Sequence, residues 1–118
     1  MRRKLPPKYL KDYPCSIAAV ACALGELPES TEDYIDSLGE NGYATLSQAN
    51  KLIRSSLKVK KRIDYKRGSR PKLKDFQLDG CAVVCVLGHY LYVEDDTYYS
   101  FYDNLMDDVV SVWLLKEK

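Results

Sequence analysis

The sequence predicts a single α+β domain in which helices come first and an antiparallel sheet follows. Apolar residues recur at helical spacing through the first half of the chain, and they alternate or run continuously through the second half. With 118 residues, of which 46% are hydrophobic, the chain has the size and composition of one globular domain. We therefore treat residues 1–118 as one domain, with a basic N-terminal arm at residues 1–12.

The first predicted helix covers Ser16–Leu24. From Ile17 onward, apolar side chains recur at positions i, i+3, i+4 and i+7, and alanines fill most of the remaining positions. Pro14 is suited to the position at or just before the first turn, and Gly25 to the helix end. Because its side chains are small, this helix can pack closely on all sides, which favours a central, buried position.

Two further helices are predicted before the sheet. The first is Ser30–Leu38, where the serine can cap free backbone donors and Gly39 ends the helix. The second runs from Leu46 to Leu57, and Thr45 with Gln48 forms a capping-box pattern at its start.

The hydrophobic period changes after the third helix. One segment alternates, one is continuously apolar and therefore expected to be covered on both faces, and two surround the turn Asp95-Asp96 as a hairpin. The predicted strands are Val59–Tyr65, Cys81–Leu87, His89–Glu94, Thr97–Tyr102 and Val109–Leu115.

The four cysteines do not have the spacing of a zinc site. Only Cys81 and Cys85 are close in sequence, and they lie in an apolar strand. We expect no metal or cofactor, and we expect Cys22, Cys81 and Cys85 to serve packing. Cys15 differs because it heads the alanine-rich helix, where free N–H groups and the helix dipole favour a thiolate. A thiolate can attack a carbonyl carbon, and the same N–H groups can bind the resulting oxyanion.

His89 is the only histidine, so it is the only candidate base for a cysteine nucleophile. A base of this kind needs an orienting partner on its far nitrogen. In a hairpin of two six-residue strands, Asp103 or Asn104 would return to the side of His89. Each residue taken singly also has a structural explanation, as a helix start, a core histidine or a turn signal.

The ordered set of Cys15, His89 and Asp103 or Asn104 resembles the papain-like cysteine peptidases. The most similar branch comprises the compact bacterial enzymes that process bacteriocin leader peptides ending in two glycines. The cysteine helix of that branch resembles Tyr13–Gly25, and its histidine and acid strands resemble Cys81–Val93 and Phe101–Asn104. The similarity covers about residues 8 to 115.

This resemblance implies a papain-like fold, with the central cysteine helix packed on the C-terminal sheet. It also implies a small bacterial or phage hydrolase that cleaves an amide or related acyl bond through a thioester. Cys15 would be the nucleophile, His89 the base and then acid, and Asp103 the orienting residue, with Asn104 as its substitute. The family has a glutamine six residues before the cysteine as an oxyanion donor, whereas this chain has Tyr9 there. Tyr9, Lys8 or Lys11 would have to replace it.

Eleven of the eighteen basic residues fall between Lys51 and Lys74, where Asp64 is the only acid. The expected explanation is an edge strand guarded by lysines beside a solvated loop. An acidic protein partner is the next alternative, and nucleic-acid binding is the least favoured one. The missing glutamine leaves open a catalytically inactive papain-like fold that binds a peptide or protein.

The first residues are basic, with no apolar core before Pro14, and no apolar run approaches the length of a membrane span. We therefore expect a cytoplasmic protein with a peptide or protein substrate and no membrane association.

Overall fold

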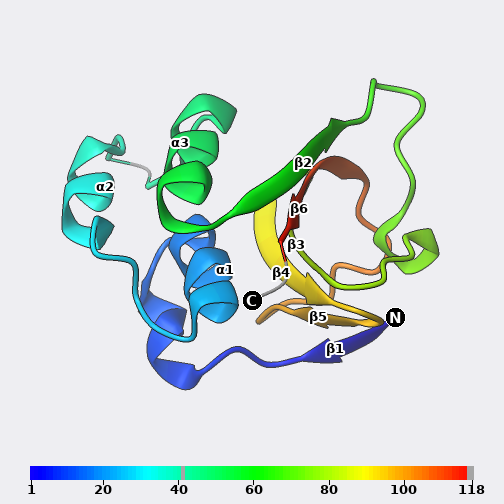
Figure 1. Cartoon of the computed structure of the whole chain (residues 1–118), viewed down its shortest axis with the longest axis horizontal. Helices are drawn as coiled ribbons and strands as arrows, with labels where there is room; N and C mark the ends of the chain where they lie inside the picture. Colours follow the sequence, from blue (N-terminus) through cyan, green and yellow to red (C-terminus); the bar gives the residue numbers. More distant parts are fainter. Residues whose placement is uncertain (41, 117–118) are drawn as a thin grey trace.

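The computed structural model describes residues 1–40 and 42–116, and within these ranges it confirms the α+β class (Figure 1). The helical segments are the 3-10 helices η1 (Lys8–Asp12) and η2 (Leu73–Asp75), and the α-helices α1 (Cys15–Leu24), α2 (Thr31–Ser37) and α3 (Leu46–Ser56). The strands are β1 (Arg2–Lys4), β2 (Val59–Asp64), β3 (Cys81–Val86), β4 (His89–Glu94), β5 (Thr97–Tyr99) and β6 (Val109–Leu115). Apart from β1 and the short η2, which follows β2, the predicted order of helices before strands is confirmed.

The sheet is mixed, so the prediction of a purely antiparallel sheet is wrong. The described strands lie in the order β1-β5-β4-β3-β6-β2, and all neighbouring pairs are antiparallel except β1 with β5. Arg2 lies opposite Thr97, and the Arg2 N–H donates to the Asp96 carbonyl at 2.7 Å. The basic arm thus begins as an edge strand. Three consecutive charged residues carry no apolar alternation, so the sequence pattern gave no sign of this pairing.

Helix α1 is central, as predicted, and the three α-helices lie together on one side of the sheet (Figure 1). Ile17 and Val20 of α1 pack in one buried cluster with Ile53 of α3 and Trp113 of β6. The indole N–H of the fully buried Trp113 donates to Asn50 Oδ1 at 2.9 Å. This bond satisfies a polar atom that would otherwise be costly to bury.

Strand β3 is covered on both faces, which confirms the interpretation of its continuous apolar run. Val83 and Cys85 belong to the cluster beneath the helices. Val84 and Val86 alternate with them and belong to a second cluster, which includes Leu73 of η2. The five residues after Cys81 in β3 are all buried, so the strand needs no polar alternation.

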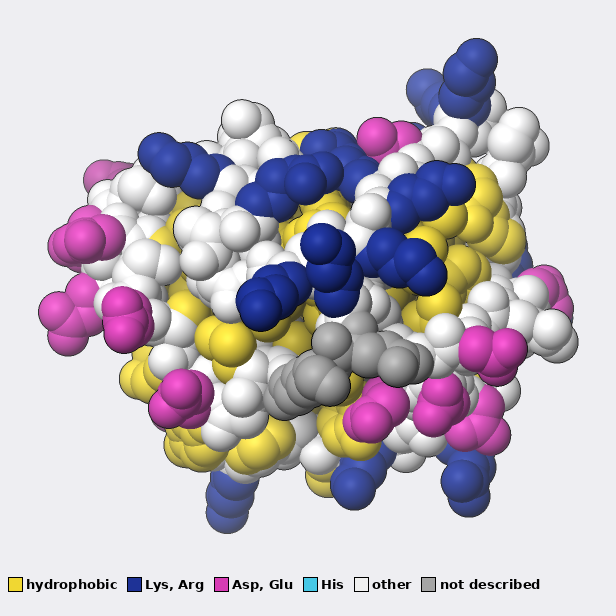
Figure 2. All heavy atoms as spheres, in the orientation of Figure 1, with side chains coloured by type: hydrophobic (Ala, Val, Ile, Leu, Met, Phe, Trp, Pro, Cys, Tyr) yellow, Lys and Arg dark blue, Asp and Glu magenta, His cyan; other side chains and the backbone are white. Residues whose placement is uncertain are grey.

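Strand β2 is the edge strand opposite β1, as the lysine-rich sequence predicted. Lys60 and Lys61 are exposed, while the Arg62 guanidinium lies 5.1 Å from the centre of the Trp113 ring and forms an ion pair with Asp64 at 2.9 Å. Figure 2 shows basic side chains gathered on the face over α3 and β2. Flanking lysines hinder pairing of an edge with a second chain.

The capping predictions have different outcomes. Thr45 and Gln48 form the predicted capping box, with the Gln48 N–H donating to Thr45 Oγ1 at 3.1 Å. Ser30 occupies the N-cap position of α2, but its side chain forms no cap hydrogen bond there, so that expectation is wrong. Gly25 ends α1 with φ at 84°, a left-handed conformation that glycine adopts without strain.

Among the described residues, no helix combines the length and apolar character that crossing a membrane requires.

Candidate active site

Cys15 is the first residue of α1, and the structure holds its side chain between the helix and strand β4. Its side chain packs against the buried cluster beneath the helices, next to Tyr90. The preceding Pro14 has no side-chain group that can cap the helix, and no cap hydrogen bond is made there. The backbone N–H groups of Tyr90, Ser16 and Cys15 itself are directed at the Cys15 sulfur. The thiol therefore lies in a small set of backbone donors.

Burial of Cys15 nevertheless raises the pKa of its thiol above the ordinary value, because the surrounding protein desolvates the anion. The backbone N–H groups lower the pKa in part, but burial is the larger effect. The expectation of a thiol with a lowered pKa is therefore wrong for Cys15 considered without a base. The sequence pattern revealed the helix terminus but not the depth at which the sulfur lies. A thiolate here has to form by proton transfer to a neighbouring group.

His89 is brought to the same place by a tight hairpin. Val86 pairs with His89, so Leu87-Gly88 is a two-residue turn between β3 and β4. Gly88 has φ at 76°, a conformation in which a side chain would be strained. The turn places His89 at the first position of β4, next to Tyr90, whose backbone N–H acts to lower the pKa of the Cys15 thiol.

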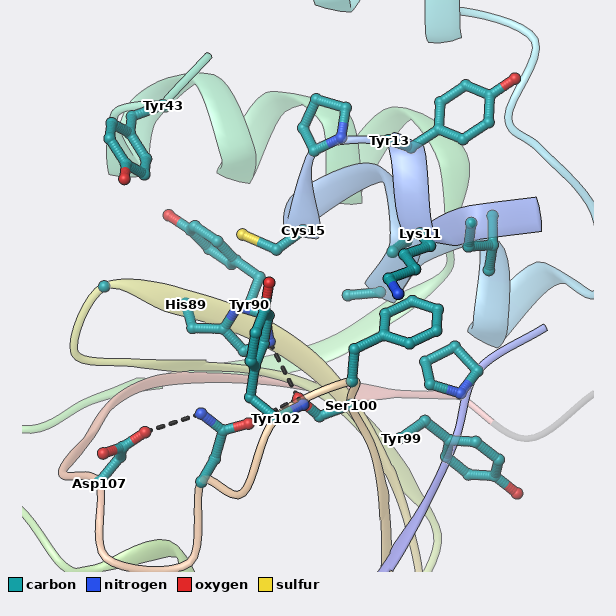
Figure 3. Close-up of a pocket in the computed structure, with 18 of the residues that line it drawn as sticks. Lys11, Tyr13, Cys15, Tyr43, His89, Tyr90, Tyr99, Ser100, Tyr102 and Asp107 are labelled. Atoms are coloured by element: carbon teal, nitrogen blue, oxygen red, sulfur yellow. Dashed lines mark hydrogen bonds between the residues drawn. The ribbon is translucent and has the colours of Figure 1, made fainter. Parts of the chain in front are cut away.

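Cys15 and His89 line one cleft of about 460 Å³, together with residues from η1 and from the segment after β5. A neighbouring hollow of about 230 Å³ shares both residues and extends past Tyr43. Figure 3 shows Cys15 between Tyr43 on one side and Lys11 on the other, with the His89 ring below the sulfur. Tyr43 and Tyr102 are exposed by 72% and 66%, so two large aromatic side chains border the cleft that contains Cys15.

Ser100 is the hydrogen-bond partner of His89. The Nε2 atom of His89 lies 3.1 Å from Ser100 Oγ, and Ser100 Oγ donates to Asn104 Oδ1 at 2.6 Å. Asn104 Nδ2 then donates to Asp107 Oδ2 at 2.7 Å. We call these residues the Ser100–Asn104–Asp107 chain. The Tyr102 ring contacts His89 edge to face, with ring centres 5.6 Å apart.

The two predicted orienting residues differ in position. Asn104 lines the cleft and is 5% exposed, and it reaches His89 through Ser100. Asp103 does not line the cleft. Its Oδ1 atom accepts a hydrogen bond from Tyr98 Oη at 3.4 Å and one from the Leu105 N–H at 3.1 Å. The structure thus links Asn104 to His89 and uses Asp103 to fix the following turn.

Strand β5 is shorter than predicted, which explains this difference. Tyr92 pairs with Tyr99, the last residue of β5, so the hairpin ends before it reaches His89. Ser100 Oγ accepts the Tyr102 N–H at 3.1 Å, which turns the chain out of the sheet. The sequence-based prediction assumed a hairpin of two six-residue strands, so it could not include this turn.

Tyr9, the predicted oxyanion donor, does not line the cleft and is 51% exposed. Lys11, two residues further along η1, does line it. The tight 3-10 helix sets this choice, because residues two positions apart in it face different directions. Among the described residues that line the cleft, Lys11 is the one lysine or arginine and Asp107 the one carboxylate.

Sequence reasoning missed Ser100, Asp107, Tyr102 and Tyr43 as site residues. The acid-rich stretch after Tyr102 was a signal for Asp107, but spacing alone did not favour it over Asp103. Ser100 carried no signal, because a lone serine after a strand is common in turns.

The described residues contain no group of three or more His, Cys, Asp or Glu side chains that could hold a metal ion. All four cysteines are free, and burial raises the pKa of both Cys22 and Cys85 to about 11.

No protein-family model matches the sequence, and no curated protein or solved structure gives a significant match. The chemistry of the site therefore has to be argued from its own geometry.

Proposed function

We propose that this protein is a papain-like cysteine hydrolase that cleaves an amide or related acyl bond in a peptide or protein. The observation that carries the proposal is the shared cleft of Cys15 and His89, in which the Tyr90 N–H also acts to lower the pKa of the thiol. A nucleophile and a base on adjacent elements, with the base oriented by a third group, form the arrangement required for nucleophilic catalysis.

The orientation of the histidine ring supports the same chemistry. Because Nε2 of His89 is bonded to Ser100, the other ring nitrogen, Nδ1, is the one left for the sulfur proton. Burial lowers the pKa of His89, and the negative charge of Asp107 raises it in part. The ring is therefore neutral at pH 7 and able to accept a proton.

The reaction follows from these positions. Sγ of Cys15 attacks the acyl carbon while its proton passes to Nδ1 of His89, and the carbonyl becomes an oxyanion. When the intermediate collapses, the bond to the leaving group breaks and His89 returns the proton to the leaving atom, which gives a thioester. Water then attacks the thioester, His89 takes its proton, and the Cys15 thiol is restored as the acid leaves.

The oxyanion has one candidate donor in the backbone N–H of Cys15, at the uncapped start of α1. Lys11 is the side chain at the cleft that can add positive charge, and Tyr9 does not line the cleft.

The resemblance to papain-like enzymes also rests on the packing of a central helix, which begins with a cysteine, against the strand that carries the histidine. The parallel edge strand β1 lies beyond the part of the chain that carries the likeness.

An acyl-transfer experiment tests the proposal directly. The protein is mixed with p-nitrophenyl acetate, nitrophenol release is followed, and the acetylated residue is located by mass spectrometry. We expect a burst with one acetyl group on Cys15, followed by slower turnover. His89→Ala should lower the acetylation rate by about 100-fold, because it removes the general base. Cys85→Ala is the matched control and should keep the burst.

Two results would overturn the hydrolase. One is acetylation of Cys15 at the same slow rate as Cys22 and Cys85. The other is a rate that His89→Ala leaves unchanged. Either one would favour the alternative of a papain-like fold that binds a peptide without turnover.

A further inference from the structure

We propose that Asp107 is a positioning residue that fixes the proton of His89 on Nε2, acting through Asn104 and Ser100. The inference rests on the proposed function only where it assigns a use to the free Nδ1 atom. The location of the proton is a property of the fold, and it can be measured without any substrate.

The first step is the orientation of the Asn104 amide. A carboxylate accepts hydrogen bonds and, when ionised, donates none. Asp107 Oδ2 lies 2.7 Å from the Asn104 side chain, so the group facing it is the amide nitrogen, Nδ2. The opposite side of the amide, Oδ1, must then face Ser100.

The second step is the direction of the serine proton. Ser100 Oγ lies 2.6 Å from Asn104 Oδ1, an atom that only accepts, so the hydroxyl proton is donated there. A serine hydroxyl has one proton, which this bond uses. Toward its other neighbours Ser100 Oγ can only accept, and it accepts the Tyr102 N–H at 3.1 Å.

The third step gives the state of the imidazole. Nε2 of His89 lies 3.1 Å from an oxygen that has no proton left to donate, so Nε2 itself carries the hydrogen. In a neutral ring the other nitrogen, Nδ1, then has a free lone pair. The charge at one end of the chain thus decides which nitrogen can act as a base at the other end.

Burial prevents water from replacing the hydrogen bonds of the Ser100–Asn104–Asp107 chain. Ser100 is 2% exposed and Asn104 is 5% exposed, so water cannot easily replace either partner. Every buried polar side-chain atom of the described residues has a hydrogen-bond partner. Reversal of one bond in the chain would leave two donors or two acceptors facing each other, which is unfavourable in a buried site.

The decisive measurement is the tautomer of His89. The protein is well suited to this measurement because its sequence has a single histidine. Two-bond ¹H–¹⁵N correlation spectra at pH 8, where the ring is neutral, report which nitrogen is protonated. We expect the wild-type protein to show the Nε2–H form alone. An Nδ1–H form in the wild-type protein would overturn the inference, and this result needs no variant.

The variant Asp107→Asn tests the role of the charge. An amide at position 107 can donate as well as accept, so Asn104 becomes free to turn over and the direction of the chain is no longer fixed. We expect a measurable Nδ1–H population, and we expect the rate of Cys15 alkylation by iodoacetamide to fall in proportion to the Nε2–H population that is lost. Asp108→Asn is the matched control, since Asp108 pairs with Lys72 at 2.6 Å and should leave both readouts unchanged.

The outcomes separate this inference from the proposed function. An unchanged tautomer in a folded Asp107→Asn protein would overturn the positioning role of Asp107. An Nε2–H tautomer that changes in this variant would support that role, even if Cys15 proved unreactive toward acyl groups. In that case the proposed hydrolase alone would fail.

Discussion

His89 and Ser100 are joined by a hydrogen bond of 3.1 Å, so a hydroxyl, and not an acid, contacts the far nitrogen of the imidazole. The carboxylate of the site is Asp107, two hydrogen bonds further away. A direct carboxylate would hold a positive imidazole strongly. A relayed one controls the position of the proton while leaving the ring easier to deprotonate, which agrees with the lowered pKa of His89.

Replacing Ser100 should therefore disable the site. In Ser100→Ala, the Nε2–H of His89 and Oδ1 of Asn104 both lose their partner. We expect Cys15 alkylation at pH 7 to slow by about tenfold or more. The free energy of unfolding, measured by urea titration, should fall by about 1–3 kcal/mol.

Ser111→Ala is the control for this variant, because Ser111 is also buried and donates to Asp64 at 2.6 Å, outside the cleft. It should lower stability while leaving the Cys15 rate intact. Equal Cys15 rates in the two variants would contradict a role for Ser100 at the site.

Replacing Asn104 and replacing Asp103 should have sharply different effects on Cys15 reactivity, although the two residues are neighbours. Asn104→Ala breaks the chain between Ser100 and Asp107, so we expect at least a tenfold loss of Cys15 reactivity. Asp103→Ala removes the bonds to Tyr98 and to the Leu105 N–H, so it should cost about 1 kcal/mol of stability and leave reactivity within twofold. The rate of Cys15 alkylation measures the change in reactivity, and thermal unfolding measures the change in stability. The reverse order would restore Asp103 as the orienting residue.

The pH dependence follows from the lowered pKa of His89. The unfolded chain binds a proton at the ordinary value of 6.5, and the folded chain binds it only at lower pH. Stability due to this group is thus complete above pH 6.5 and is lost progressively as pH falls toward the folded pKa. Urea titrations between pH 7.5 and 5 should show this loss.

His89→Gln should remove that part of the pH dependence. In the wild-type protein, the rate of Cys15 alkylation should fall at acid pH with a midpoint below 6.5, because protonated His89 cannot act as a base. A midpoint above 6.5 would contradict the burial of the ring as the main influence on its pKa.

Lys11 should favour substrates that carry a carboxylate. It is the one lysine or arginine among the described residues lining the cleft, and no ion pair of the described residues occupies it. We expect bromoacetyl-Ala-Glu-amide to alkylate Cys15 about three- to fivefold faster than bromoacetyl-Ala-Gln-amide, the effect of one exposed ion pair. Lys11→Ala should remove this preference. Lys8→Ala, an exposed position on the same 3-10 helix, should keep it.

The lysines of β2 should prevent self-association. In the variant Lys60→Thr with Lys61→Thr, the edge strand keeps its backbone and loses its charge. We expect concentration-dependent dimers or larger species in sedimentation velocity, since an uncharged edge can pair with a second copy. Lys51→Thr with Arg54→Thr, on α3, is the control and should stay monomeric. Salt-dependent binding of an oligonucleotide by the wild-type protein, lost in the β2 variant, would instead favour the nucleic-acid alternative.

Local physics made much of this fold predictable. The Thr45–Gln48 capping box, the glycine that ends α1 and the alternation along the strands each depend on residues close together in sequence. For the same reason, the sequence located Cys15 at a helix start and His89 at a strand start. It also identified β2 as an edge, because a strand with so many lysine and arginine residues is unsuited to the centre of a sheet.

The sequence alone therefore determined the helices, most strands and the two residues proposed to carry the chemistry. Only the tertiary structure decided that β1 joins the sheet in parallel, that β5 ends at Tyr99, and that Ser100 takes the place next to His89. It also reversed the expected direction of the Cys15 pKa, since desolvation depends on how deeply the folded chain covers the sulfur. Pairing register, turn position and burial arise from contacts between distant segments, and no local pattern encodes them.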